Sequence, residues 1–119
     1  MDKNNPIAVL SRSFALKVVW LYNYLKDTKK EFVLSKQFLR SGTSIGANIR
    51  ESIYAQSRPD FLSKMSIALK ESSETEYWLE LLYESGYIDY NTYYPIYDEN
   101  CKITATLINI IKKTKEIEK

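Results

Sequence analysis

The chain has 119 residues, of which 45% are hydrophobic and 27% charged, a composition that suits one globular domain and excludes a disordered chain. Three glycines and three prolines are too few turn signals for a sandwich or barrel of many short strands. The net charge is only +2, but residues 1–59 hold ten Lys and Arg against four Asp and Glu (+6), whereas residues 60–119 hold seven against eleven (−4). Such a division can serve assembly or nucleic-acid contact, or it can be the ordinary solvated surface of helices.

The first half of the chain predicts two helices. The first is expected over about residues 6–27, because Asn5 suits the N-cap, Pro6 suits the first helical position, and apolar residues recur every three to four positions. The second is expected over about residues 35–57, with Ser35 as its N-cap.

The second half predicts two more helices. The third is expected over about residues 59–85 and opens at Pro59. The fourth is expected over about residues 90–115, with two alternative starts: either Asp89 caps it and Pro95 kinks an early turn, or it begins later with Pro95 in the first turn. No stretch alternates with period two, so the predicted fold is all-α, a single domain with an antiparallel up-down-up-down four-helix bundle.

The second predicted helix has two faces without charge, although a surface helix normally has one. One face is Phe38, Gly42, Ile45, Ile49 and Ile53, and the other is Ser41, Ser44, Asn48, Ser52 and Ala55. Each glycine lowers helix propensity by about 1 kcal/mol relative to alanine. We therefore expect the glycines to allow a neighbouring backbone to pack closely. We expect this helix to be covered on one side by its own fold and on the other by a copy of the chain. The alternative is that Gly42 marks a kink or a late helix start.

The core stripe of the third predicted helix includes two polar residues, Ser72 and Glu76. A carboxylate at a core position must be paired or hydrogen-bonded, or it becomes protonated. If the middle helices pack antiparallel, the available partners are Arg40, Ser44, Asn48 and Arg50. Glu76 is then either a catalytic carboxylate or part of a buried polar network that sets helix register or subunit contacts, and we favour the network.

Several kinds of chemistry are excluded by residues that the chain lacks. There is no histidine, which rules out zinc sites of Cys/His type, Glu-x-x-His di-iron sites and histidine-activated nucleophiles, and no phosphate-binding glycine loop is present. We therefore expect no enzyme, cofactor or metal, with a carboxylate-only metal site on the third helix as the alternative. The single cysteine, Cys101, cannot form an internal disulfide, and neither a signal peptide nor a membrane span is recognisable. A cytoplasmic location without a membrane partner is expected.

The segments "KQFLRSGTSIGANIRESIYAQSRPDF" and "IALKESSETEYWLELL", with the later "GYI", resemble a known family, the 23S rRNA-intervening-sequence proteins. The matching positions are Gln37, Arg40, Ser41, Ser44, Ile45, Asn48, Ile49, Glu51, Arg58, Phe61, Ala68, Ser72, Glu74, Gly86, Tyr87 and Ile88. The founding members are encoded inside insertions in bacterial large-subunit ribosomal RNA genes. One departure is Ser52, where many members have glycine.

The resemblance implies a four-helix bundle that assembles as a ring, most plausibly a homopentamer. It also implies a relationship to the accessory protein of diversity-generating retroelements, which binds nucleic acid and a reverse transcriptase through a basic surface. For most members no biochemical activity is established. On this resemblance the residues expected to form a buried polar network or interface are Ser41, Ser44, Asn48, Glu51, Ser72 and Glu76.

Two functional hypotheses follow. The first is a non-enzymatic, oligomeric accessory protein that binds RNA or DNA. The cations assigned to nucleic-acid binding are Lys17, Lys26, Lys29, Lys30, Lys36 and Arg40. The alternative is a protein–protein interaction scaffold without a nucleic-acid ligand, which docks a partner through the acidic third helix and the tyrosine-rich last loop.

Overall fold

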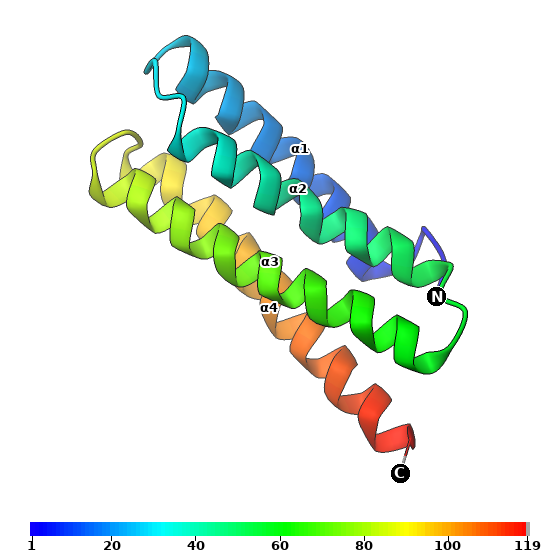
Figure 1. Cartoon of the computed structure of the whole chain (residues 1–119). Coiled ribbons are helices and arrows are strands. Elements are labelled where there is room, and N and C mark those ends of the chain that lie inside the picture. The colour runs from blue at the N-terminus through cyan, green and yellow to red at the C-terminus, as the bar shows by residue number, and fades with distance from the viewer. Residues whose placement is uncertain (119) are drawn as a thin grey trace.

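The structure, a computed structural model, describes residues 1–118 and contains four helices and, within those residues, no strand (Figure 1). The helices are α1 (Pro6–Asp27), α2 (Leu34–Ile53), α3 (Arg58–Glu84) and α4 (Tyr90–Glu118). They form an elongated bundle of 49 × 22 × 20 Å in which each helix packs against the next, and α1 also touches α4. The predicted all-α four-helix bundle is confirmed.

Consecutive helices run in opposite directions. Gly42 of α2 faces Val18 of α1. Gly46 lies one turn further along α2, and it faces Ser11, which lies nearly two turns before Val18 on α1. The same reversal holds between α2 and α3 and between α3 and α4, as seen in the pairs Arg40–Glu74, Glu51–Lys64, Ser72–Thr104 and Tyr83–Tyr93.

The start of α2 differs from the prediction, because Ser35 is not its N-cap. The helix begins one residue earlier, at Leu34, and no side chain of the capping residue Val33 bonds to it. Instead Glu31, four residues before Ser35, turns its carboxylate onto the first turn and accepts the backbone N–H groups of Val33, Leu34 and Ser35 at 3.1, 3.0 and 2.7 Å. A carboxylate placed here also meets the positive end of the helix dipole.

The end of α2 lies four residues before the predicted position. The Tyr54 N–H bonds to the carbonyl oxygens of Glu51 and Ser52, which tightens the last turn and ends the helix at Ile53. This leaves Ser57 in an extended conformation as the N-cap of α3, with its hydroxyl accepting the Asp60 N–H at 3.2 Å.

The start of α4 follows the first of the two alternatives, with Asp89 as its cap. Asp89 accepts the Thr92 N–H on its carboxylate at 2.9 Å and the Tyr93 N–H on its carbonyl, so α4 begins at Tyr90 and Pro95 lies inside it. Pro95 is the sixth residue of the helix and has no N–H for the Asn91 carbonyl, so one bond of the second turn is absent.

The core is apolar and draws on all four helices. Its largest fully buried side chains are Phe14, Val18, Leu21, Leu25, Phe38, Ile45, Ile49, Met65, Leu79, Leu82, Ile103 and Leu107. Removing such side chains from water is the main stabilising contribution to a fold of this size. Within residues 1–118, no helix is both long enough and apolar enough to cross a membrane.

The second uncharged face of α2 is partly buried within the chain, and α3 contacts it at Ser41. Ser41 and Ser52 are buried, and Ser41 Oγ accepts a hydrogen bond from the Thr75 hydroxyl of α3 at 3.0 Å. The other three residues of this face, Ser44, Asn48 and Ala55, are half-buried, and the expectation that a second copy covers the face stays a prediction. Apolar residues are exposed on α1, where Leu16 and Trp20 are 59% and 60% exposed, and on α4, where Ile108 is 51% exposed.

The glycines of α2 allow α1 to lie against it. A Cβ atom at Gly42 would stand 2.7 Å from a methyl carbon of Val18, and one at Gly46 would stand 3.3 Å from the Ser11 carbonyl oxygen. Because α2 is continuous through both positions, the glycines serve this approach, and the alternative of a kink or late start at Gly42 is wrong.

We predict that Gly42→Ala destabilises the protein, because the new methyl group overpacks against Val18 at a cost of about 1–3 kcal/mol. This effect exceeds the gain of about 1 kcal/mol in helix propensity. Urea unfolding followed by circular dichroism measures the change. Adding Val18→Ala removes the obstruction, so the double variant should be clearly more stable than the sum of the two single effects indicates. Simple additivity would contradict the proposed contact.

Candidate nucleic-acid interface

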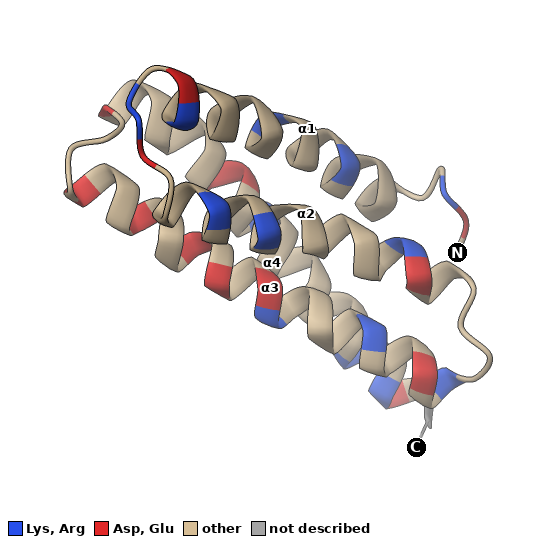
Figure 2. Cartoon of the chain, turned by 45° about the horizontal axis from the view of Figure 1, so that its top comes forward, with Lys and Arg blue, Asp and Glu red and all other residues tan. Residues whose placement is uncertain are grey.

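Two of the six predicted cations are neutralised by acidic residues. Lys17 of α1 pairs with Glu99 of α4, and Arg40 of α2 bridges Glu71 and Glu74 on α3, where acidic positions face basic ones (Figure 2). The hydrogen bond from Arg40 lowers the pKa of the Glu74 carboxyl, so that carboxylate stays ionised beside it. These two cations therefore hold helices together and have little charge left for a ligand.

The other four predicted cations lie near the turn between α1 and α2. Lys26 is 3.8 Å from its neighbour Asp27, and its ammonium group lies 5.4 Å from the centre of the Tyr22 ring. The three remaining lysines form no ion pair in the described part of the chain: Lys29, Lys30 and Lys36. The acidic residues of the same turn reduce its net positive charge.

Glu31 organises this turn. Its side chain is only 7% exposed and receives three backbone N–H groups, while the Ser35 hydroxyl donates to the Glu31 carbonyl oxygen at 2.8 Å. Burial acts to raise the pKa of Glu31, but the hydrogen bonds from Ser35, Leu34 and Val33 outweigh it, and the pKa is lowered. The carboxylate thus positions the neighbouring lysines by fixing the start of α2.

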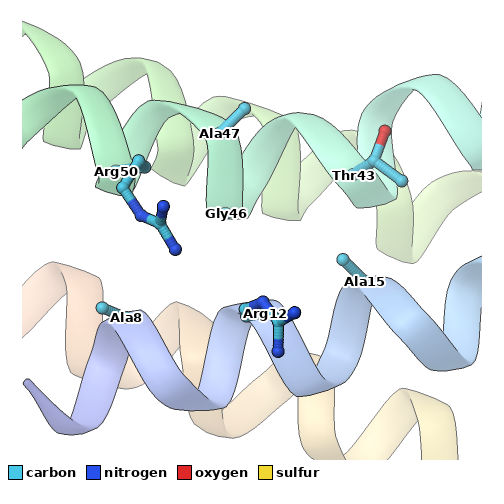
Figure 3. A pocket seen from close by; sticks show the side chains of 7 residues that line it. All are labelled: Ala8, Arg12, Ala15, Thr43, Gly46, Ala47 and Arg50. Atoms are coloured by element: carbon cyan, nitrogen blue, oxygen red, sulfur yellow. The ribbon is translucent and has the colours of Figure 1, made fainter. Parts of the chain in front are cut away.

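Two arginines that were not among the predicted site residues line one cavity between α1 and α2 (Figure 3). The cavity has a volume of about 250 Å³, and Arg50 reaches into it from α2 while Arg12 lies on the α1 side. The rest of its wall is small or short: Ala8, Ala15, Thr43, Gly46 and Ala47. Because no large side chain fills the space where α1 and α2 diverge from their contact, the arginine side chains border an open recess.

A second hollow of about 520 Å³ shares Arg12 and Arg50. The rest of its lining is Lys3, Asn4, Val9, Ser13 and Leu16. No carboxylate lines either space, and neither arginine forms an ion pair within residues 1–118. Like charges that share a site repel one another unless an opposite charge joins them. Guanidinium groups bind phosphate and carboxylate in a two-pronged geometry, so this site is suited to an anion.

The buried polar network joins α3 to α2 and α4. The hydroxyl of Ser72 accepts a hydrogen bond from Thr104 at 3.1 Å, and its carbonyl accepts one from the Asn100 amide at 2.9 Å. On the other side of α3, Thr75 donates to Ser41. Three members of this network were not predicted from the sequence: Thr75, Asn100 and Thr104.

The position predicted for Glu76 is corrected. Thr75 occupies the buried position, and Glu76 is half-buried at the seam between α3 and α4, where the Cys101 thiol lies 3.7 Å from its carboxylate. It therefore does not meet the cations of α2. Burial is the largest cause of the raised pKa of Cys101, which keeps the thiol protonated and weakly nucleophilic.

The three remaining predicted network residues lie on α2. The Ser44 hydroxyl donates to the Arg40 carbonyl at 2.6 Å and the Asn48 amide to the Ser44 carbonyl at 2.9 Å, so both bond within their own helix. Glu51 is exposed and pairs with Lys64 at 3.6 Å. Across residues 1–118 there is no group of three or more Cys, Asp or Glu arranged to hold a metal ion.

These features define a small all-α protein, a four-helix bundle with a buried polar network. Between its first two helices lies a recess lined by two arginines and no carboxylate. The chain belongs to the 23S rRNA-intervening sequence protein family, whose model matches residues 3–109. The resemblance inferred from the sequence is thereby confirmed.

One similar solved structure is a crystal structure of a protein with unknown function from the S23 ribosomal protein family of Bacteroides thetaiotaomicron. It is 55% identical, with a TM-score of 0.88, and the match covers 89% of this chain and 98% of that one. No curated protein matches the chain.

We predict that Glu31→Gln destabilises the protein by about 1 kcal/mol at about pH 7, as loss of a capping group does. The folded-state pKa of Glu31 is lowered, so its contribution is complete above the unfolded value of about 4.3 and disappears as the pH falls through the folded value. Urea unfolding of both proteins at neutral and acidic pH should show the difference shrinking in acid. Glu116→Gln, at the exposed end of α4, is the control, and an unchanged difference in acid would contradict the role of the charge.

Proposed function

We propose that this protein is a non-enzymatic, self-associating accessory protein that binds RNA or DNA through the phosphate backbone. The observation that carries the proposal is the pair Arg12 and Arg50, which line one recess without an acidic partner in residues 1–118. Lys3 extends the same basic surface through the adjoining hollow. Cations of this kind bind phosphates and release counterions, which makes the affinity fall steeply with salt.

The small net charge of +2 is compatible with this proposal because the charges are segregated. Most acidic residues belong to the second half of the chain. On α3, Glu71 and Glu74 pair with Arg40, whereas Glu76, Glu80 and Glu84 lie toward α4. The α1–α2 side keeps the unpaired arginines and, at its far end, the lysines of the turn. A backbone that follows this side meets positive charge at both ends of the bundle.

Self-association is proposed through the outward face of α1. Val9, Leu16 and Trp20 are 53%, 59% and 60% exposed, and their spacing of seven and four residues places them on one face of the helix. Exposed apolar residues of this kind are typical of a surface that meets another protein. Val9 and Leu16 place this surface beside the hollow that Arg12 and Arg50 border. We assign a second copy of the chain to it, because the family resemblance implies a ring of identical chains. The proposed assembly is a homopentamer, following the family resemblance.

One observation favours the alternative of a protein-docking scaffold. A recess of about 260 Å³ between α3 and α4 is lined by Glu80, Tyr83, Glu84, Tyr93 and Tyr97. Burial, followed by the charges of Glu76 and Glu84, raises the pKa of Glu80. Such a surface suits a basic segment of another protein. Pull-down from a native extract with and without nuclease separates the hypotheses, because only capture through nucleic acid is lost on nuclease treatment.

We predict that the protein binds labelled RNA and DNA at low salt, and that binding weakens between about 50 and about 200 mM salt. The variant Arg12→Ala/Arg50→Ala should bind more weakly and lose about one unit of salt slope per arginine removed. Filter binding over a salt series measures both. Arg58→Ala removes the same kind of charge outside both hollows and should change little. Absence of binding even at the lowest salt would refute the proposed function.

We predict that native mass spectrometry finds five chains of 13.9 kDa each, about 70 kDa in total. Leu16→Asp/Trp20→Asp should yield monomers, because charges on the α1 stripe would have to be buried at the interface. Both residues are largely exposed, so the helical circular dichroism spectrum should be unchanged. Tyr54→Asp, in the α2–α3 turn and 74% exposed, is the control. A monomeric wild-type protein, or an assembly that survives both substitutions, would contradict this proposal.

A further inference from the structure

The charge of the recess between α1 and α2 matches one kind of phosphate better than another. Arg12 and Arg50 each bring a full positive charge and a fork of N–H donors to the same space. A phosphate monoester carries about −1.5 to −2 charges near pH 7 and presents three acceptor oxygens. An internal phosphodiester carries one charge and has only two oxygens free of the chain. Two arginines without a carboxylate therefore balance a monoester and leave an excess positive charge on a diester.

The shape of the recess also favours a phosphate monoester over an internal phosphodiester. Its base is closed where α1 and α2 approach, since a Cβ at Gly46 would lie only 3.3 Å from the Ser11 carbonyl oxygen. Its volume of about 250 Å³ is below the range of about 300–1,000 Å³ that holds drug-sized ligands, so it suits one compact group. A strand end can place its last phosphate in such a recess, whereas an internal phosphate must let the chain continue on both sides.

The adjoining hollow provides a path for the rest of the strand. This hollow has a volume of about 520 Å³. It lies next to the recess, because Arg12 and Arg50 border both spaces. Asn4 and Ser13 offer hydrogen-bonding groups to a sugar or base, and Lys3 offers a charge to the next phosphate. The alanine side chains of the recess add no polar group that competes with an anion for the arginines.

We propose that the recess formed by Arg12 and Arg50 binds the terminal phosphate monoester of a nucleic-acid strand in preference to an internal phosphodiester. The proposal deepens the proposed function and depends on it for the identity of the strand. The same chemistry is offered by a free nucleotide or by inorganic phosphate, so the test must distinguish these sources.

The test compares single-stranded oligonucleotides of one sequence with a 5′-phosphate, with a 3′-phosphate, or with hydroxyl groups at both ends. Fluorescence polarisation with the full-length protein measures their affinities. At least one phosphorylated end should bind about tenfold more tightly than the hydroxyl form, the effect of gaining one hydrogen bond to a charged group. The preference should decline below about pH 6, where the monoester takes up a proton.

Two variants connect the preference to the recess. Arg12→Ala/Arg50→Ala should bind all three oligonucleotides with equal affinity. Arg12→Lys/Arg50→Lys keeps the charge but loses the two-pronged donors, so overall binding should survive while the preference shrinks. Arg58→Ala should retain the full preference. Equal affinity of the wild-type protein for all three oligonucleotides would overturn the inference and leave the proposed function standing.

Titration with a nucleoside 5′-monophosphate and with inorganic phosphate, followed by NMR of the Gly46 and Ala47 amides, separates the remaining outcomes. Free monophosphate that binds as tightly as the phosphorylated strand would assign the recess to nucleotides and overturn the strand-end proposal. If no oligonucleotide binds, the proposed function fails, and the strand-end assignment fails with it. Saturable shifts with inorganic phosphate would in that case leave only a phosphate site.

Discussion

The close contact between α1 and α2 is the constraint on which the other features depend. Two glycines one turn apart on α2 let α1 approach so far that a methyl group at Gly42 would collide with Val18. The contact locks the register of the two helices, because only one alignment brings both glycines under α1. That register places Arg12 and Arg50, which are 38 positions apart in the sequence, at the border of one recess. The same small residues thus determine both packing and the anion site.

The sequence predicted the number and order of the helices because each apolar stripe repeats with the helical period over many turns. It also predicted the cap at Asn5 and gave Asp89 as the cap in one of two alternatives, and in both places a side chain acts within three residues of its own position. It missed the end of α2 and the capping role of Glu31, which depend on how the neighbouring turns fold. Helix boundaries of this kind are set by local competition among hydrogen bonds, which composition alone does not resolve.

The buried polar network shows why an error of one residue in a predicted core position matters in a helix. Adjacent residues differ by about 100° around the axis, so the predicted core position at Glu76 and the observed one at Thr75 face different neighbours. Thr75 lies three residues after Ser72 and Glu76 lies four residues after it. Both spacings fit the core stripe of a helix. The choice between them is made by α2, whose Ser41 hydroxyl is available as an acceptor. A pattern confined to one helix contains no information about that partner.

The basic site was missed for a related reason. Lysines clustered in one turn are visible in the sequence, whereas Arg12 and Arg50 become neighbours only through the packing of α1 on α2. Conversely, Arg40 looked available until α3 brought Glu71 and Glu74 against it. What a cation can bind is decided less by its position in a charged run than by whether the fold supplies a carboxylate to it. In this bundle α3 supplies carboxylates to the face of α2 that it covers, and the opposite edge of α2, which borders α1, keeps its arginine open to an external anion.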